Sequence, residues 1–106
     1  MNLRRLAVAT AAVAAAAPVF PVHAQDPQTL QVAGLAATCA NCHGTQGRTV
    51  GDALPTLAGM NRDAMLEQLR AFRSGARPAT IMHQLTRGYS DAQLEQIATY
   101  FSRQPR

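Results

Sequence analysis

The residues best suited to chemistry lie in one short segment, Cys39-Ala40-Asn41-Cys42-His43. Two cysteines three positions apart fall within one turn of a helix, so both thiols can face a flat group that lies alongside. A histidine directly after the second cysteine can then bind a metal ion at the centre of that group. This C-x-x-C-H arrangement is typical of c-type haem attachment, with two thioether bonds and the histidine as an iron ligand. The segment therefore predicts one covalent haem c, attached through Cys39 and Cys42 and ligated by His43.

Two other uses of a C-x-x-C pair have to be weighed against haem attachment. A zinc site of this kind needs a second pair of ligands, and the chain has only two cysteines. A thiol–disulfide oxidoreductase would use Cys39 and Cys42 as its redox pair, but such a motif is expected within a βαβ pattern that the sequence lacks. The adjacent histidine favours haem, and the oxidoreductase is kept as an alternative.

A haem bound through His43 leaves the opposite coordination position of the iron for another side chain. Three methionines lie downstream, Met60, Met65 and Met82, and a thioether ligand raises the reduction potential of a haem. Met65 falls on the apolar stripe of an expected helix, where a core position is ordinary, and Met60 is expected on the histidine side of the ring. Met82, separated from His43 by a whole helix, is the expected sixth ligand. His83 is its rival because imidazole also binds iron, and an open position is the third option.

Pro55 is expected to orient the iron-bound histidine. A histidine that ligates a metal usually donates its other ring N–H to a neighbouring acceptor, which fixes the tautomer and the ring orientation. The carbonyl of a stiff proline turn suits this task, and Pro55 follows His43 by one short loop. The alternative is a proline that only marks a turn. For Arg48 and Tyr89, contact with a haem propionate and a solvent-facing loop position are equally open.

Residues 1–24 are expected to be a secretory signal peptide that is cleaved from the folded domain. A basic head with Arg4 and Arg5 precedes an apolar run over 6–17, and the small residues that end at Ala24 resemble a cleavage site. The apolar run is too short to cross a bilayer. We therefore expect a periplasmic mature domain over 25–106 without a membrane span.

This mature domain would be small and only weakly charged. Without Arg4 and Arg5 it keeps eight basic residues, all arginine, against six acidic ones, which leaves a net charge of +2. No basic stripe with interleaved aromatic residues occurs, so nucleic acid is not an expected partner. Four aromatic residues and no tryptophan give little material for a core. Domains of this size usually need a disulfide, a metal or another staple, and a covalent haem would supply one.

The elements that must position these residues are helical. The first helix is expected to begin at Asp26, an N-cap followed by proline at the first helical position, and to continue to Cys39. Asn61 is the expected N-cap of a second helix, which ends at Gly75. A third helix begins with a capping box at Ser90.

Two long loops connect these helices. The first covers 44–60 and is rich in glycine, and the second covers 76–89 and includes a short helical turn at 81–85. Loops of this length are uncommon in a compact domain unless they serve a function, and covering both faces of a haem is such a function. No period-2 strand pattern appears. The predicted fold class is therefore all-α, with three main helices and long loops around one covalent haem.

Together these segments resemble a class I cytochrome c. The haem motif followed by Gly44, and the segment Leu54-Pro55-Thr56-Leu57-Ala58-Gly59, are similar to those of small bacterial members. The segment from Thr80 to Ser90 looks most similar to the monohaem cytochrome subunit of flavocytochrome c sulfide dehydrogenase. The resemblance implies that the Pro55 carbonyl holds the haem histidine and that Met82 is the distal ligand.

The chain departs from that family in two respects. Some members carry two haems on a duplicated domain, whereas one motif here allows one haem. His83 stands where a small residue is expected, so the choice between Met82 and His83 as sixth ligand stays open. In the family the first and last helices pack near a glycine and an aromatic residue, which by analogy places Gly34 against Tyr100 or Phe101.

The resemblance implies one-electron transfer by the haem. The expected donor is the FAD-containing subunit of a sulfide dehydrogenase, and another redox protein would be the acceptor. The chain would then be a subunit of a sulfide–cytochrome c reductase without a substrate site of its own. Nothing in the mature sequence resembles an FAD-binding segment, so the flavin would have to be on a partner. The alternative is a free small soluble cytochrome c that serves other respiratory or photosynthetic enzymes. The hypotheses from other classes are the thiol oxidoreductase and a haem enzyme or gas-binding sensor in which Met82 is displaced.

Overall fold

A computed structural model describes residues 24–106, so the signal peptide expected over 1–24 lies outside the described residues except for Ala24. The elements in chain order are α1 (Pro27–His43), the 3₁₀ helix η1 (Thr45–Gly47), α2 (Arg62–Ser74), α3 (Met82–Arg87) and α4 (Asp91–Ser102). No strand occurs within residues 24–106. The predicted all-α fold class is confirmed.

Local hydrogen bonds define most of the helix ends at the expected residues. The Asp26 carboxylate accepts the N–H of the third helical residue at 3.0 Å, and the Asn61 side chain accepts two N–H groups of the first turn of α2. Gly75 ends α2 in the left-handed conformation with φ of 82°. At α4, Ser90 and Gln93 exchange both bonds of a capping box. These three helices begin where their capping residues predict.

The first helix extends further than expected and includes the whole C-x-x-C-H motif. It continues beyond Cys39 to His43, since no glycine or proline interrupts this stretch. Gly44, with φ of 79°, is the first residue suited to leave the helix, and its N–H still donates to the Ala40 carbonyl at 3.0 Å. The motif therefore occupies the last turns of a helix of 17 residues.

The second loop contains a complete short helix where only a turn was expected. Helix α3 has six residues, and its N-cap residue Ile81 makes no side-chain capping bond. Its support comes from burial instead: Thr86 is 2% exposed, and its hydroxyl donates to the Met82 carbonyl at 2.8 Å. Tertiary packing, which a local sequence pattern does not reveal, stabilises this element.

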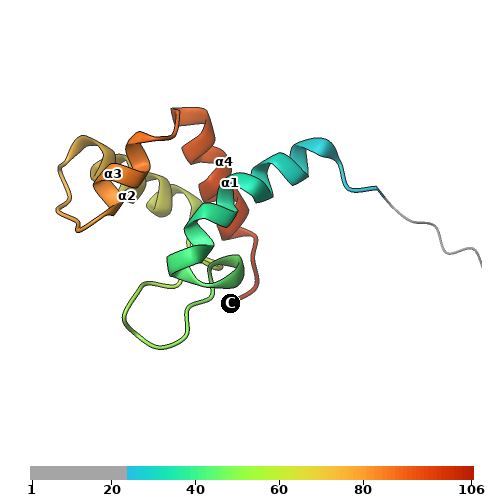
Figure 1. Cartoon of the computed structure of the whole chain (residues 1–106), viewed down its shortest axis with the longest axis horizontal. Helices are drawn as coiled ribbons and strands as arrows, with labels where there is room; N and C mark the ends of the chain where they lie inside the picture. Colours follow the sequence, from blue (N-terminus) through green and yellow to red (C-terminus); the bar gives the residue numbers. More distant parts are fainter. Residues whose placement is uncertain (1–23) are drawn as a thin grey trace, which may run out of the picture.

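Helix α4 is the central element of the described part of the chain (Figure 1). It packs against α1 and α2, and α2 in turn packs against α3. Four residues of α4 are nearly or fully buried and form a hydrophobic core with one residue of α1 and two of α2: Leu94, Ile97, Ala98 and Phe101 with Ala36, Met65 and Leu66. The first turns of α1 extend away from this core (Figure 1).

The expected contact of Gly34 with Tyr100 or Phe101 is wrong. Gly34 is exposed, and nothing lies within 4 Å of the position that a Cβ would take there. Helix α1 meets the core two residues closer to the motif, through Ala36, so Gly34 lies outside this contact. The close approach of a glycine to an aromatic ring occurs at Gly47 instead, where a Cβ would lie 2.7 Å from Phe101 Cδ1.

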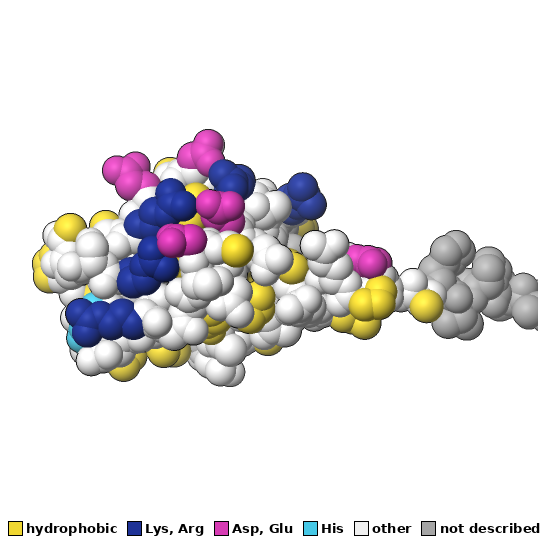
Figure 2. Space-filling view, turned by 90° about the horizontal axis from the view of Figure 1, so that it is seen from above, with side chains coloured by type: hydrophobic (Ala, Val, Ile, Leu, Met, Phe, Trp, Pro, Cys, Tyr) yellow, Lys and Arg dark blue, Asp and Glu magenta, His cyan; other side chains and the backbone are white. Residues whose placement is uncertain are grey.

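The charged side chains form a mixed surface and not a patch of one sign. Figure 2 shows basic and acidic side chains next to one another on one face, and four ion pairs join α2 to α4: Arg62 and Arg70 with Glu95, and Arg70 and Arg73 with Asp91. Such solvent-exposed pairs contribute little individually, about 0–1 kcal/mol each. None of the helices within 24–106 has the length and apolar character that crossing a membrane requires.

Substitution of Gly47 and Gly51 by alanine separates backbone strain from steric crowding. Both glycines have φ near 80°, but a Cβ at Gly51 meets open space, whereas one at Gly47 meets Phe101, Leu57 and the backbone N of Ala58 within 3.0 Å. We expect Gly51→Ala to lower the free energy of unfolding by about 1–2 kcal/mol, the cost of a left-handed non-glycine residue.

Gly47→Ala should lower that free energy by roughly 2 kcal/mol more, because a crowded core adds an overpacking cost. Guanidinium denaturation of the two haem-loaded variants, followed by far-ultraviolet circular dichroism, measures the difference. Equal losses would contradict the tight packing of Gly47 against Phe101.

Candidate functional site

The carboxyl-terminal turns of α1 form one wall of a cavity of about 320 Å³. Cys39, Cys42 and His43 all line it. Because the helix continues through the motif, Cys39 and His43 are four positions apart and lie on the same side of it. The three residues that the sequence predicts for haem attachment are therefore brought together at one cavity, whose volume is within the range of small-molecule sites.

The remaining walls of the cavity are mainly apolar. They come from the loop before α2 and from α2, α3 and α4, and include Leu54, Leu57, Leu69, Phe72, Ile81 and Leu85. Three of these side chains are large, apolar and more than 40% exposed: Leu54, Ile81 and Leu85. Solvent-exposed apolar surface gathered around a concave site marks a place where a ligand binds. A large, flat and mostly apolar group such as a haem fits these walls, and it would cover the exposed side chains.

His43 is buried and has a defined hydrogen-bond partner. It is 7% exposed, and its Nδ1 lies 2.8 Å from the Pro55 carbonyl oxygen. Because a carbonyl can only accept, the proton of the neutral imidazole resides on Nδ1, and the lone pair of Nε2 stays free for a metal. Pro55 also lines the cavity, so the residue expected to orient the histidine lies within hydrogen-bond reach of it.

The structure separates the two candidates for the sixth ligand. Met82 lines the cavity, whereas His83 is absent from its walls. The His83 Nδ1 atom is buried and has no hydrogen-bond partner within residues 24–106. Met60 and Met65 also reach the cavity, but Met65 is a core residue at 3% exposure and Met60 packs against the same core. Of the three methionines, Met82 is the one that does not belong to that core.

Cys39 lacks the character of a redox-active nucleophile. Burial raises the pKa of its thiol, and a hydrogen bond from Thr38 only partly opposes this effect. Reactive cysteines in C-x-x-C oxidoreductases instead have a lowered pKa, because the thiolate is the attacking species. The environment of Cys39 therefore argues against the thiol oxidoreductase reading.

Tyr89 has a place at the cavity that its sequence position left undecided. It lines the cavity, and its hydroxyl is hydrogen-bonded to the Thr38 hydroxyl, one residue before Cys39. Arg48 does not line the cavity and bonds to Gln46 and to the Pro105 carbonyl instead. The sequence did not predict the hydrogen bond of Thr38, because its partner is 51 residues away and no local sequence pattern indicates the contact.

Among the described residues that line the cavity, Arg77 is the only arginine, and no lysine or carboxylate accompanies it. Its guanidinium stacks 4.7 Å from the centroid of the Phe72 ring and donates to the Gln68 side chain. Arg70 and Arg73, near the end of α2, instead pair with carboxylates on α4.

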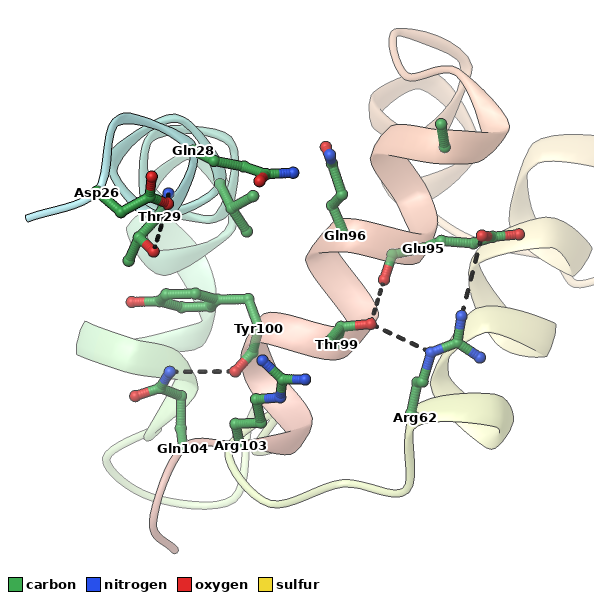
Figure 3. Close-up of a pocket in the computed structure, with 12 residues that line it drawn as sticks. Asp26, Gln28, Thr29, Arg62, Glu95, Gln96, Thr99, Tyr100, Arg103 and Gln104 are labelled. Carbon is green, nitrogen blue, oxygen red and sulfur yellow. Dashed lines mark hydrogen bonds and ion pairs between the residues drawn. The ribbon is translucent and has the colours of Figure 1, made fainter.

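A larger hollow of about 730 Å³ lies between the first turns of α1 and the outer face of α4 (Figure 3). Its lining is more polar: Arg62 donates to the Thr99 hydroxyl at 3.1 Å, and Asp26 caps α1 at its edge. No cysteine, histidine or methionine lines it. Although larger, this hollow offers no ligand for a haem iron, and the chemistry of the chain is concentrated at the smaller cavity.

Comparison with known proteins agrees with the site. Residues 31–104 match the cytochrome c family, so the chain belongs to the cytochrome c family. It is 34% identical over 65 residues to cytochrome c-554(548) of Halomonas halodenitrificans, an alignment that covers 58% of this chain and 78% of that protein.

Two further relatives are longer proteins. The chain is 37% identical over 63 residues to the thiosulfate dehydrogenase electron acceptor of Stutzerimonas stutzeri and 36% identical over 60 residues to cytochrome c-552 of Acidithiobacillus ferridurans. Each alignment covers 57% of this chain but only 29% and 26% of the respective relative. The chain thus matches less than a third of the length of either protein.

The family match and the C-x-x-C-H motif show that the protein binds one covalent haem c through Cys39, Cys42 and His43. The fold and the class of protein expected from the resemblance to class I cytochromes c are confirmed.

Replacement of the two cysteines tests the covalent attachment. Cys39→Ala and Cys42→Ala should each leave one thioether bond, so acid–acetone should fail to extract the haem from either variant. The double variant has no thioether bond, and its haem should be extracted completely. The pyridine haemochrome spectrum should shift stepwise as the bonds are lost. Full extraction of haem from the unsubstituted protein would contradict covalent attachment.

Proposed function

We propose that the protein is a periplasmic one-electron carrier in the oxidation of reduced sulfur compounds, with an FAD-containing sulfide dehydrogenase subunit as its electron donor. The observation that carries the electron-transfer part is the single cavity lined by Cys39, Cys42, His43, Pro55 and Met82. Its walls are mainly apolar and bear few polar groups that would recognise a substrate. Such a site suits a carrier whose redox chemistry belongs to its cofactor.

In this proposal His43 and Met82 would hold the haem iron, and Pro55 would orient the histidine. When bound, the haem supplies an iron centre that gains and loses one electron. The Pro55 carbonyl accepts the Nδ1 proton of His43 and so keeps Nε2 directed to the metal. A thioether from Met82 favours the reduced iron and a high reduction potential. Apolar side chains such as Leu85 and Phe72 exclude water from the site.

Substitution of Met82 tests the axial ligand. Met82→Ala should abolish the weak red absorption band that signals methionine–iron coordination in the ferric protein, and it should lower the reduction potential. Carbon monoxide should then bind the reduced protein readily. Met60→Leu and His83→Ala are the matched controls and should retain the band. Survival of the band in Met82→Ala, or its loss in Met60→Leu, would refute Met82 as the ligand.

The choice of donor draws on the resemblance of the segment around Met82 to sulfide dehydrogenase cytochrome subunits. A specific observation favours a second candidate within the same chemistry, since one relative is named a thiosulfate dehydrogenase electron acceptor. That relative is much longer than the matched region, so its partner need not be shared. Cytochromes c are usually periplasmic or secreted, which supports the proposed location and the signal peptide over 1–24.

Rapid mixing distinguishes the two donors. Ferric protein is mixed anaerobically with sulfide and the purified flavoprotein subunit, or with thiosulfate and a purified thiosulfate dehydrogenase, and haem reduction is followed by absorbance. We expect reduction in the first mixture to be at least about tenfold faster, which corresponds to roughly 1.4 kcal/mol of barrier. Sulfide without the flavoprotein is the control for direct reduction.

Size-exclusion chromatography of the flavoprotein mixture should also show a stable complex. Fast reduction only by the thiosulfate pair would refute the flavoprotein donor and leave haem-based electron transfer intact. Fast reduction by both pairs without a complex would indicate a free carrier.

A further inference from the structure

The carbonyl that faces His43 comes from an exposed part of the chain. Pro55 and Thr56 are exposed, and Leu54 is 42% exposed. Val50 is fully exposed, and nothing lies within 4 Å of a Cβ built at Gly51. Core packing therefore does not hold the loop of residues 50–55 in place. Its last residue, Pro55, nevertheless lies 2.8 Å from the buried histidine through its carbonyl oxygen.

Two threonine hydroxyl groups form a hydrogen bond where the chain enters and leaves this loop. The Thr49 and Thr56 Oγ1 atoms lie 2.7 Å apart, a hydrogen bond in which either hydroxyl can donate. The bond spans residues 50–55, and Thr56 directly follows Pro55 in the chain. Outside the residues that this bond encloses, the Gly47 carbonyl accepts the N–H groups of Leu57 and Ala58 at 2.8 and 3.1 Å.

These backbone bonds anchor the chain after the loop to the fixed end of η1. Gly47 is itself packed against Phe101, and the Gly59 N–H donates to the Phe101 carbonyl at 2.9 Å. The chain directly after the loop, at residues 57–59, is thus held by the core. The two ends of the loop itself are joined by the Thr49–Thr56 hydrogen bond. Of the two supports, the threonine pair lies next to the carbonyl that contacts His43.

We propose that Thr49 and Thr56 form a clasp that positions the Pro55 carbonyl against His43 and so adjusts the reduction potential of the haem. The clasp rests on the proposed roles of His43 as iron ligand and of Pro55 as its acceptor. Neither threonine lines the haem cavity, so both act through Pro55 as positioning residues.

The expected direction of the effect follows from the basicity of the imidazole. A short hydrogen bond from Nδ1 to a carbonyl raises the basicity of a ligating histidine. A more basic ligand stabilises the ferric iron more than the ferrous iron. Loss of the clasp lengthens the average Nδ1–carbonyl distance, so the ferrous state should become relatively more stable.

Isosteric substitutions remove the clasp without leaving a cavity. In the haem-loaded protein, Thr49→Val and Thr56→Val should each raise the ratio of reduced to oxidised protein at a fixed ambient potential by about threefold. This is a modest effect, because the Pro55 carbonyl itself is retained. The double variant should show the same shift as either single variant, because all three lose one bond.

Thr56→Ser keeps the hydroxyl and should restore the original ratio. Thr45→Val, at an exposed threonine just before the same loop, is the matched control and should leave the ratio unchanged. Spectroscopic redox titration measures the ratios, and proton nuclear magnetic resonance of the ferric protein follows the His43 ring.

The outcomes separate the clasp from the ligation on which it depends. Hyperfine-shifted His43 ring protons together with an unchanged ratio in both valine variants would overturn the clasp alone. Additive shifts in the double variant, or an equal shift in Thr45→Val, would also overturn it. His43 ring protons without a hyperfine shift in the unsubstituted protein would overturn the proposed ligation itself.

Discussion

The apolar cavity at the end of α1 is the constraint on which the rest of the structure depends. The described residues alone form an incomplete hydrophobic core, because this cavity interrupts it. A small core around α4 holds three of the helices together. Large apolar side chains beside the cavity remain exposed, among them Ile81 and Leu85 of the second loop. Covalent attachment at Cys39 and Cys42 brings the missing apolar surface to this position. The haem is thus a structural element as well as a redox centre, because burial of apolar surface is the main favourable term in folding.

The helices and the loops contribute different residues to the cavity. Helix α1 carries the attachment motif on its last turns, and α4 supports α1 through Phe101 and its neighbours. The loops bring Pro55 and Met82 to the same cavity. Their length, unusual in a compact domain, therefore corresponds to side chains and carbonyls that no short turn could deliver to one site.

Features with a local physical cause could be predicted from the sequence. The side chains of Asp26, Asn61 and Ser90 bond to N–H groups within their own first turn, so these helix starts need no tertiary information. The C-x-x-C-H motif is equally local. The hydrogen bond between His43 and Pro55 spans 12 residues. It was predicted from the general tendency of metal-bound histidines to donate their other ring N–H, and from the resemblance to class I cytochromes c.

Features that depend on contacts distant in sequence could not be predicted in this way. Helix α3 is held by burial of Thr86 and not by a cap. The glycine that meets Phe101 is Gly47 and not Gly34, since where two helices cross depends on the whole packing arrangement. The Thr38–Tyr89 bond joins residues 51 positions apart and leaves no pattern in the sequence.

The unequal lengths of α1 and α3 give the two walls of the cavity different resistance to local opening. The wall with His43 belongs to a helix of 17 residues, whereas that with Met82 belongs to an uncapped helix of six. A helix of six residues is far too short to persist on its own. Amide hydrogens of α3 should therefore exchange with solvent before those at the end of α1, as one cooperative unit of lower stability. The wall that contains Met82 is therefore where small molecules would most easily enter the cavity.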